Sequence, residues 1–263
     1  FPPDCPCIGL LAVTSIIDLN ADLGETDSPD GIARDIAIMD IVSSCNIACG
    51  GHAGSPDVMR TMLMSAKSSS IAPGAHPSYP DRAGFGRTSM DISLANLEAS
   101  LARQLKDIKE IAAEVRVNLT HIKPHGALYN DAQDDPGLST LLVDMAARAN
   151  LALVGMPGTL IQQKASDKGI TFIAEAFIDR QYSSNGRLVP RSEAGAVIAD
   201  EDDRIRQGLS LAKATPLLAQ DGGVLTIEAQ TLCLHSDSDG ALETARRMRT
   251  TLEQAGILIG SGR

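Results

Sequence analysis

Short runs rich in β-branched and small apolar residues alternate with longer segments of helical periodicity along almost the whole chain. Strands are predicted at residues 15–20, 46–49, 71–75, 119–123, 151–155, 171–177 and 224–229. Helices are predicted at 55–69, 93–115, 135–149, 201–219 and 239–255. Strand–helix units in series, without a Gly-, Pro- or Ser-rich linker, are typical of one parallel α/β domain. About seven units in ~250 residues favour a closed, TIM-like β/α barrel over an open doubly wound sheet.

The net charge of the chain restricts the kinds of partner that it can bind. The chain carries 23 Lys and Arg against 33 Asp and Glu, a formal net charge of −10. Non-specific nucleic-acid binding requires clustered basic residues, and anionic membrane surfaces attract basic segments. No apolar run approaches the ~18 to 20 residues of a membrane span. We therefore expect neither nucleic acid nor a membrane as a partner.

Residues 1–15 differ from the rest of the sequence. They contain an apolar run at 8–13, but the first basic residue of the chain is Arg34, so a secretory signal is not indicated. We interpret 1–15 as an N-terminal extension, disordered and outside the fold, and 16–263 as a single barrel domain. The five cysteines lack paired spacings, which predicts reduced thiols and a cytoplasmic location.

Ionisable residues and glycines follow nearly every predicted strand. In parallel α/β folds the carboxyl ends of the strands meet at one end, where the site forms. All five histidines fall in these segments, and none falls in a predicted helix: His52, His76, His121, His125 and His235. This distribution predicts a polar site at the carboxyl ends of the strands.

The first strand carries Asp18, Asn20 and Asp22 at alternate positions, so all three face the same side. Acids that face a barrel interior are costly unless they are paired or bind a cation. The alternative is that the Asp22–Glu25 segment is only a turn with capping acids. We favour a functional role for Asp22.

Lys123 and His125 form the most suggestive pair. A lysine at a strand end can act as an electrophile or as a base, and His125 can act as a general base or a metal ligand. The mixture of His and Asp suits a single divalent metal in an open site, although the spacing does not prove one. Phosphate-loop (GxxxxGK(S/T)), GxGxxG, GxSxG and HExxH motifs are absent, so the chain shows no recognisable nucleotide, serine-hydrolase or zincin site.

Six strings occur together in fixed order: IDLNADLGE, SSCNIACGGHAG, GAHPSYPDRAGFGR, HIKPHGALYN, FIDRQYSSNGRLVPRS followed by AGAVI, and TLCLHSD. With them the chain resembles the LamB/YcsF family from about Ile16 to the last helix. Gly51 and Ser236 are small departures from the family pattern that adjust pocket shape. The resemblance implies a seven-stranded barrel of the glycoside hydrolase/deacetylase type. It also implies ATP-dependent opening of the 5-oxo-L-proline lactam to L-glutamate, together with subunits B and C of a 5-oxoprolinase. ATP is then expected to be handled mainly with those partner subunits.

For this reaction, we predict four catalytic residues. Asp22 or His125 activates water, with or without a bound metal, while Lys123 and His52 stabilise the oxyanion. Arg82 or Arg180 is expected to hold the substrate carboxylate. The predicted substrate-binding residues are Asn20, Glu25, His76, Arg82, Tyr129, Glu175, Arg180 and His235.

Two other classes of function fit parts of the pattern. The first is a stand-alone metal-dependent deacetylase or amidohydrolase, which metal content and ATP-independent turnover would distinguish. The second is a non-catalytic scaffold subunit. The concentration of ionisable groups at strand ends argues against a scaffold.

Overall fold

The computed structural model describes residues 15–236 and 240–262. Within this part of the chain, seven parallel strands close into a barrel: β1 (Ile16–Leu23), β2 (Ser44–Ala48), β3 (Ala72–His76), β4 (His121–Ile122), β5 (Ala152–Gly155), β6 (Phe172–Phe177) and β9 (Thr231–His235). β1 pairs with β2 on one side and with β9 on the other, which closes the ring. The predicted seven-stranded β/α barrel is confirmed. Except for Ser15, the predicted extension lies outside the described residues.

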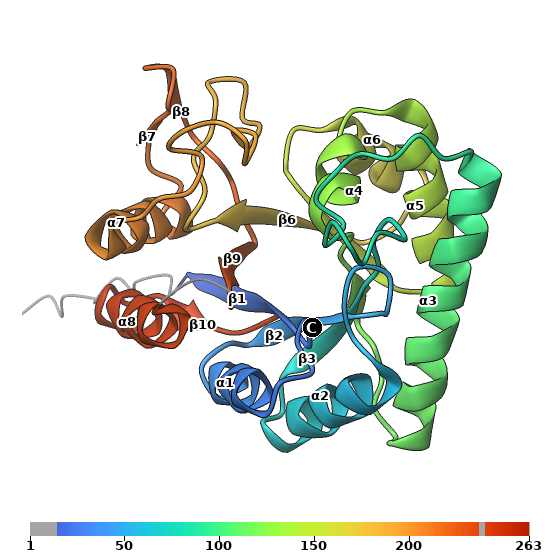
Figure 1. Ribbon diagram of the computed structural model, residues 1–263. Coiled ribbons are helices and arrows are strands. Elements are labelled where there is room, and N and C mark those ends of the chain that lie inside the picture. The colour runs from blue at the N-terminus through green and yellow to red at the C-terminus, as the bar shows by residue number, and fades with distance from the viewer. Residues whose placement is uncertain (1–14, 237–239, 263) are drawn as a thin grey trace, which may run out of the picture.

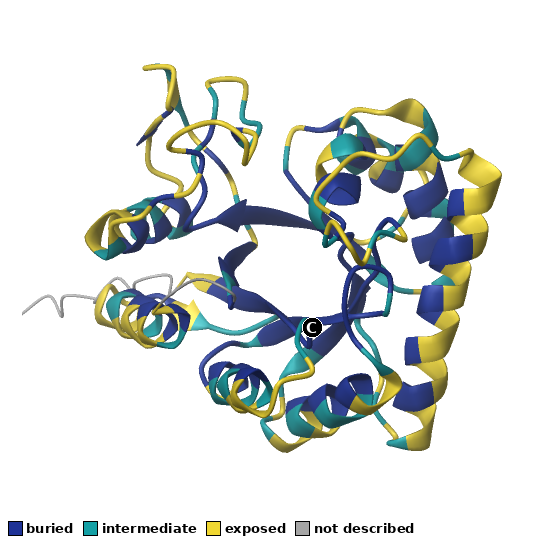
Figure 2. Ribbon diagram, in the orientation of Figure 1, coloured by how far each residue is buried: buried dark blue, intermediate teal, exposed yellow. Residues whose placement is uncertain are grey.

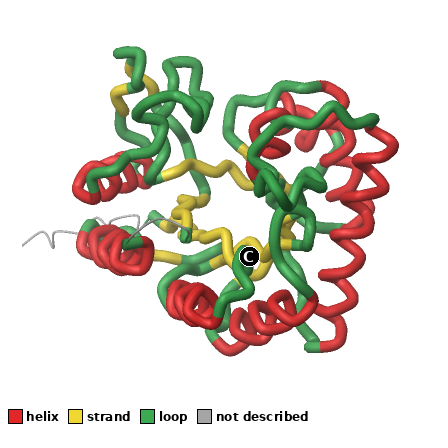
Figure 3. The backbone as a smooth tube through the Cα atoms, viewed as in Figure 1, coloured by secondary structure: helices red, strands yellow, loops and turns green. Residues whose placement is uncertain are grey.

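Helices surround the strands on the outside of the barrel (Figures 1 and 3). They are α1 (Pro29–Met39), α2 (Pro56–Ser68), α3 (Leu94–Glu114), α4 (Gly126–Asp131), α5 (Pro136–Ala149), α6 (Leu160–Asp167), α7 (Glu201–Ala212) and α8 (Ala241–Gln254). Local signals fix several of their starts: Ser55 accepts a hydrogen bond from the Val58 amide, and Pro56 occupies the first turn. The sequence pattern missed α1, α4 and α6, and it placed the end of α7 too late.

The predicted seventh strand, 224–229, is wrong. Only Val224–Leu225 (β8) is extended there, and it pairs antiparallel with Leu217–Leu218 (β7) away from the barrel. The seventh barrel strand is β9, which lies between β6 and β1. Both segments have strand composition, so pairing partners rather than local propensity decide which one enters the barrel. A short strand, β10 (Leu258–Ile259), pairs in parallel with the start of β1.

An aliphatic core lies between the helices and the strands, as the absence of Trp and the scarcity of other aromatic residues require. Helix α3 buries the stripe Leu97, Leu101, Leu105 and Ile108 against the barrel and exposes its other face (Figure 2). This packing holds the strands in place, and their carboxyl ends can therefore position polar side chains accurately.

Among the described residues, no helix is both long and apolar enough to cross a membrane.

Candidate active site

A cavity of about 480 Å³ opens where several strands end. The strand ends and the segments after them contribute most of its charged lining: Asp22 near the end of β1 and Glu25 after it, His76 at the end of β3, Lys123 and His125 after β4, Arg180 after β6, and His235 at the end of β9. These segments are far apart in the sequence. The barrel brings them to one end, as the strand-end pattern predicted.

Lys123 lies at the centre of this group and is almost fully buried. Its Nζ donates to Oδ1 of Asp22 at 2.9 Å and lies 2.8 Å from Oε1 of Glu175. The Sγ of Cys233 is 3.1 Å away. Burial alone would lower the pKa of Lys123, but the Asp22 carboxylate, the sulfur and Glu175 raise it well above its ordinary value. Lys123 is therefore a fixed ammonium.

Asp22 is held on both of its oxygens. Its Oδ1 accepts hydrogen bonds from Lys123 and from Nδ2 of Asn46, the latter at 2.8 Å. Its Oδ2 lies 3.4 Å from Nε2 of His76. Burial would raise the pKa of Asp22, but His76 and Lys123 bring it well below its ordinary value. Asp22 is a carboxylate at neutral pH.

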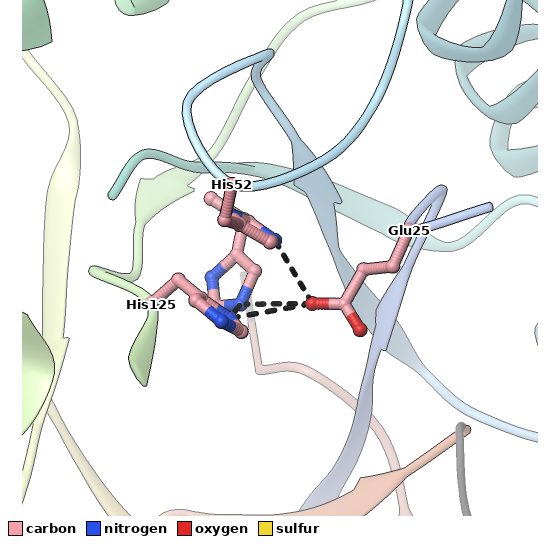
Figure 4. A group of neighbouring side chains, drawn as sticks. Glu25, His52 and His125 are labelled. Carbon is pink, nitrogen blue, oxygen red and sulfur yellow. Dashed lines mark hydrogen bonds and ion pairs between the residues drawn. The ribbon is translucent and has the colours of Figure 1, made fainter. Parts of the chain in front are cut away.

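Glu25 faces three histidines, which with it form the Glu25–histidine group (Glu25, His52, His76 and His125). Its Oε1 lies 3.0 Å from Nε2 of His52, 3.3 Å from Nδ1 of His125 and 3.9 Å from Nε2 of His76. Figure 4 shows the carboxylate facing His52 and His125. Burial would raise the pKa of Glu25, but hydrogen bonds with His125 and His52 lower it well below the ordinary value.

Burial has the opposite effect on two of these histidines. It lowers the pKa of His52 to about 3, even though Glu25 opposes the shift, and it also lowers the pKa of His125. Both rings are therefore neutral at physiological pH, and a neutral imidazole can accept a proton or bind a cation through its unprotonated nitrogen.

Asp179 and Arg191 hold His235 at the end of β9. The His235 Nδ1 lies 2.7 Å from Oδ2 of Asp179, and its Nε2 lies 3.0 Å from an Arg191 Nη2. Burial would lower the pKa of His235, but Asp179 raises it. Arg87, Arg180, Arg187 and Arg191 all line the cavity. These four arginines can bind a negatively charged group.

Below the cavity lies a second polar set, the inner network (Asp18, Asn20, Ser44, Asn46, His121 and Thr231), none of which lines the cavity. Asp18 accepts from the hydroxyls of Ser44 and Thr231 at 2.6 and 2.7 Å. Asn46 joins Asn20 to His121 at 2.8 and 2.7 Å. The inward alternation predicted for Asp18, Asn20 and Asp22 is thus present.

Some of the predicted site residues line the cavity, and others lie beneath it or outside it. Asp22, Lys123, His125, Glu25, His76, Tyr129, Arg180 and His235 line the cavity. Asn20 and Glu175 contact each other and Lys123 beneath it. His52 does not line the cavity, but it contacts Glu25 and His125, which do. Arg82 lies outside, where its guanidinium donates to the carbonyl oxygens of Gly50 and Gly54.

Sequence reasoning missed Asn46, Phe177 and the rim residue Arg187. Asn46 bonds to Asn20, Asp22 and His121 and so connects the two networks. An asparagine at an inward position of a buried strand is the signal that could have identified it. Arg187 lies in a loop after β6, and only the folded chain brings it to Asp134, with which it makes two hydrogen bonds.

Among the residues that the structure describes, two groups have the residue types and spacing to hold a metal ion: the Glu25–histidine group, and Asp22 with Cys233 and His235. In each group the potential ligand atoms lie within 4.8 Å of one another. The arrangement as a whole combines a fixed cation, a carboxylate and neutral imidazoles in one cavity. It is suited to hydrolysis of an acyl or amide bond.

Comparison with known proteins agrees with this geometry. The model of the LamB/YcsF family matches residues 17–262. Over 248 residues the chain is 41% identical to the A subunit of 5-oxoprolinase from Streptomyces coelicolor, covering 94% of this chain and 99% of that protein. The crystal structure of a lactam utilization protein from Thermus thermophilus superposes with a TM-score of 0.84 at 37% identity, covering 93% and 99% of the two chains.

A family 4 carbohydrate esterase from Streptomyces lividans is similar at fold level only. Its TM-score is 0.51 at 13% identity, with 95% of this chain and 92% of that chain covered. The predicted deacetylase type of barrel is therefore confirmed as a fold, without an inference about activity.

Proposed function

The chain belongs to the LamB/YcsF family, and we propose that it carries the lactam-opening site of an ATP-dependent 5-oxoprolinase. In this proposal it hydrolyses 5-oxo-L-proline to L-glutamate together with subunits B and C, in the cytoplasm. The observation that carries the proposal is the buried Lys123 ammonium, which Asp22 and Glu175 hold at the cavity. The name and near full-length coverage of the Streptomyces coelicolor relative support the substrate.

Lys123 acts as the electrophilic group. Its raised pKa favours this role over that of a base, because a base must give up its proton near neutral pH. Opening an unstrained lactam places negative charge on the former carbonyl oxygen. A preorganised ammonium that faces this oxygen stabilises the tetrahedral state more than the ground state.

Asp22 or His125 activates the attacking water. Asp22 is ionised, and His125 is neutral at physiological pH, so either can accept a proton. Both line the cavity beside Lys123. The water then attacks the activated lactam carbon, the ring carbon–nitrogen bond breaks, and the proton taken from the water goes to the nitrogen, which becomes the amine of glutamate. Where ATP has phosphorylated the lactam oxygen, this cleavage leaves an acyl phosphate, and a second water releases inorganic phosphate and the glutamate side-chain carboxylate.

The arginines that line the cavity hold the substrate carboxylate. Arg180 already donates Nε to the Ala196 carbonyl and an Nη2 to the Val189 carbonyl, so it is firmly positioned. Burial lowers its pKa to about 10, which leaves it cationic. A five-membered lactam with one carboxylate does not need all four arginines. The additional positive charge suits an amide oxygen activated with the phosphoryl group of ATP.

Nucleotide handling belongs with the partner subunits. The sequence has no phosphate-loop motif, and the relatives carry the word "subunit" in their name. In this division of labour, subunits B and C use ATP to activate the lactam oxygen. This chain then completes the hydrolysis.

A second candidate function is a stand-alone metal-dependent deacetylase or amidohydrolase that acts on a lactam or amide. The Glu25–histidine group favours it, because its potential ligand atoms lie within 4.8 Å of one another and three of its residues line the cavity. This function requires neither ATP nor partners.

The experiment that separates the two candidates is ATP-dependent release of glutamate from 5-oxo-L-proline. The purified chain is assayed alone and after assembly with subunits B and C, with and without ATP. Activity only in the complete, ATP-containing mixture supports the 5-oxoprolinase. Turnover by the chain alone without ATP supports the amidohydrolase, and no turnover by a verified complex contradicts the main proposal.

A further inference from the structure

Three potential ligand atoms within the Glu25–histidine group surround one point. Oε1 of Glu25 lies 3.3 Å from Nδ1 of His125 and 3.9 Å from Nε2 of His76, and the two nitrogens are 3.0 Å apart. Ligands about 2.0 to 2.1 Å from a tetrahedral zinc ion are about 3.4 Å from one another. The observed separations bracket this value.

The backbone fixes which ring nitrogens carry protons. His76 Nδ1 lies 2.7 Å from the carbonyl oxygen of Lys123, and His125 Nε2 lies 3.0 Å from that of Phe85. A carbonyl oxygen only accepts hydrogen bonds, so each of these nitrogens must donate one. Imidazole binds a metal ion in its neutral form, which has a single N–H, so in that form His76 Nε2 and His125 Nδ1 are the nitrogens with lone pairs. These two nitrogens face Oε1 of Glu25.

The partners of Glu25 also favour a cation. The Lys123 ammonium contacts Asp22 and Glu175. Among the described residues, the ion-pair partners of Glu25 are imidazoles alone. A divalent ion would give this carboxylate a full positive charge as its partner.

We propose that Glu25, His76 and His125 bind one divalent transition-metal ion, Zn²⁺ in preference to Mg²⁺ or Ca²⁺. With Nδ1 on the ion and Nε2 donating to Phe85, His125 is no longer able to act as the base, and Asp22 is the base that remains for the proposed reaction. Two imidazoles and one carboxylate form a ligand set of zinc hydrolases, whereas Mg²⁺ and Ca²⁺ take mainly oxygen ligands. The carbonyls of Lys123 and Phe85 orient the two rings, as outer partners of metal-bound histidines do.

His52 is a positioning residue rather than a ligand. Its ring is stacked on that of His125, with 3.6 Å between centroids and 4° between planes. Nitrogen lone pairs lie in the ring plane, so two parallel stacked rings cannot both point at one ion. His52 Nε2 instead lies 3.0 Å from Oε1 of Glu25, to which it donates a hydrogen bond.

The alternative group of Asp22, Cys233 and His235 is already neutralised. The Lys123 ammonium lies 2.9 Å from Asp22 Oδ1 and 3.1 Å from Cys233 Sγ. A metal ion between these two ligands would have to displace a buried positive charge. We therefore place the ion at Glu25.

The test is direct titration of the metal-stripped, full-length chain with Co²⁺, read by visible absorption, followed by displacement with Zn²⁺. Glu25→Gln, His76→Asn and His125→Gln each remove one ligand atom. The two histidine replacements keep an amide N–H near the backbone carbonyl that the ring contacts. His52→Gln keeps a donor to Glu25, and His235→Asn is the matched control outside the group. Circular dichroism and melting curves establish that each variant is folded.

We expect one Co²⁺ per chain, displaced by Zn²⁺, and a loss of affinity of at least ~100-fold in each ligand variant. His52→Gln should lose less than ~10-fold, and His235→Asn should bind as the parent chain does. The proposal is overturned if the parent chain binds no stoichiometric metal, if His235→Asn alone abolishes binding, or if His52→Gln matches the ligand variants. Glu25→Gln keeps the shape of the side chain, so it decides the matter if a histidine variant misfolds. The measurement uses no substrate and so is independent of the proposed reaction.

Discussion

Two buried polar networks are built on the same strands of this barrel. The inner network contains Asp18, Asn46 and His121 and does not line the cavity. Hydrogen bonds join its members to one another, and Asn46 also connects it to Asp22. The cavity network (Asp22, Glu25, His76, Lys123 and His125) has similar residue types, but every member lines the cavity. It holds a buried ion pair and closely spaced imidazole nitrogens. Residue type therefore does not separate the two networks, and access to the cavity is what distinguishes the one that we propose to be functional.

The largest effect is expected from Lys123→Met in the cavity network. Turnover should fall at least ~100-fold, because the developing oxyanion loses its cation. The free energy of unfolding should also fall by about 3 to 5 kcal/mol, since Asp22 and Glu175 become unpaired. Steady-state assays of the assembled complex and urea unfolding measure the two effects.

The double variant Lys123→Met/Glu175→Gln is the control for folding. It removes one of the orphaned charges and should recover part of the stability without recovering activity. Recovered turnover in this variant would show that Lys123 acts only on folding.

In the inner network, Asp18→Asn should lower the free energy of unfolding while leaving turnover nearly unchanged. Asp18 accepts hydroxyl hydrogen bonds from Ser43, Ser44 and Thr231. Charge-assisted bonds of this kind are worth roughly 1.5 to 3 kcal/mol each, so we expect a loss of about 3 kcal/mol in unfolding free energy. Turnover of the folded variant should stay within about 3-fold of the parent. A large loss of turnover at unchanged stability would remove the distinction between the networks.

Gly74→Ala tests the packing of the same inner network. A Cβ at Gly74 would lie 2.2 Å from Nε2 of His121, which Asn46 and Thr120 hold in place. We expect a loss of about 2 kcal/mol from overpacking, measured by chemical unfolding. Gly260→Ala is the matched control, because its Cβ would come no closer than 3.8 Å to a neighbouring atom, Ile16 Cγ2. Equal effects of the two substitutions would contradict the proposed clash.

The smallest effect is expected at the cavity rim. The hydrogen bond from Arg187 lowers the pKa of Asp134, so the pair contributes stability above the unfolded-state pKa of about 3.9 and loses it as the pH falls through the folded-state value. Both side chains are partly exposed, and Arg187→Ala should cost less than about 1 kcal/mol at pH 7. The difference from the parent chain should vanish in strongly acidic solution. Melting curves across pH measure it, and a growing difference at low pH would contradict the pairing.

The sequence was sufficient for the barrel and for much of the cavity wall. Alternation in β1 predicted that Asp18, Asn20 and Asp22 face inward, and strand-end position predicted Lys123 and His125. Alternation alone could not tell which inward residues reach the cavity. Asp18 and Asp22 differ only by four positions along one strand, and the depth of each depends on the tilt of β1 in the closed ring.

Other features depend on contacts that no local pattern records. β9 and the segment 224–229 have similar composition, and only pairing with β6 and β1 distinguishes them. Arg82 looked suited to a carboxylate, but the loop that carries it folds back on Gly50 and Gly54. Asn46 has no motif around it, and its role arises from neighbours on β1 and β4.

The most direct test of the central claim, that the cavity network of this chain performs the hydrolysis, is Asp22→Asn in the complex with subunits B and C. ATP-dependent glutamate release from 5-oxo-L-proline is measured beside the parent complex and the Asp18→Asn complex, with assembly verified for all three. We predict a loss of at least ~100-fold for Asp22→Asn and turnover near that of the parent for Asp18→Asn. Near-normal release by a folded, assembled Asp22→Asn complex would contradict the claim.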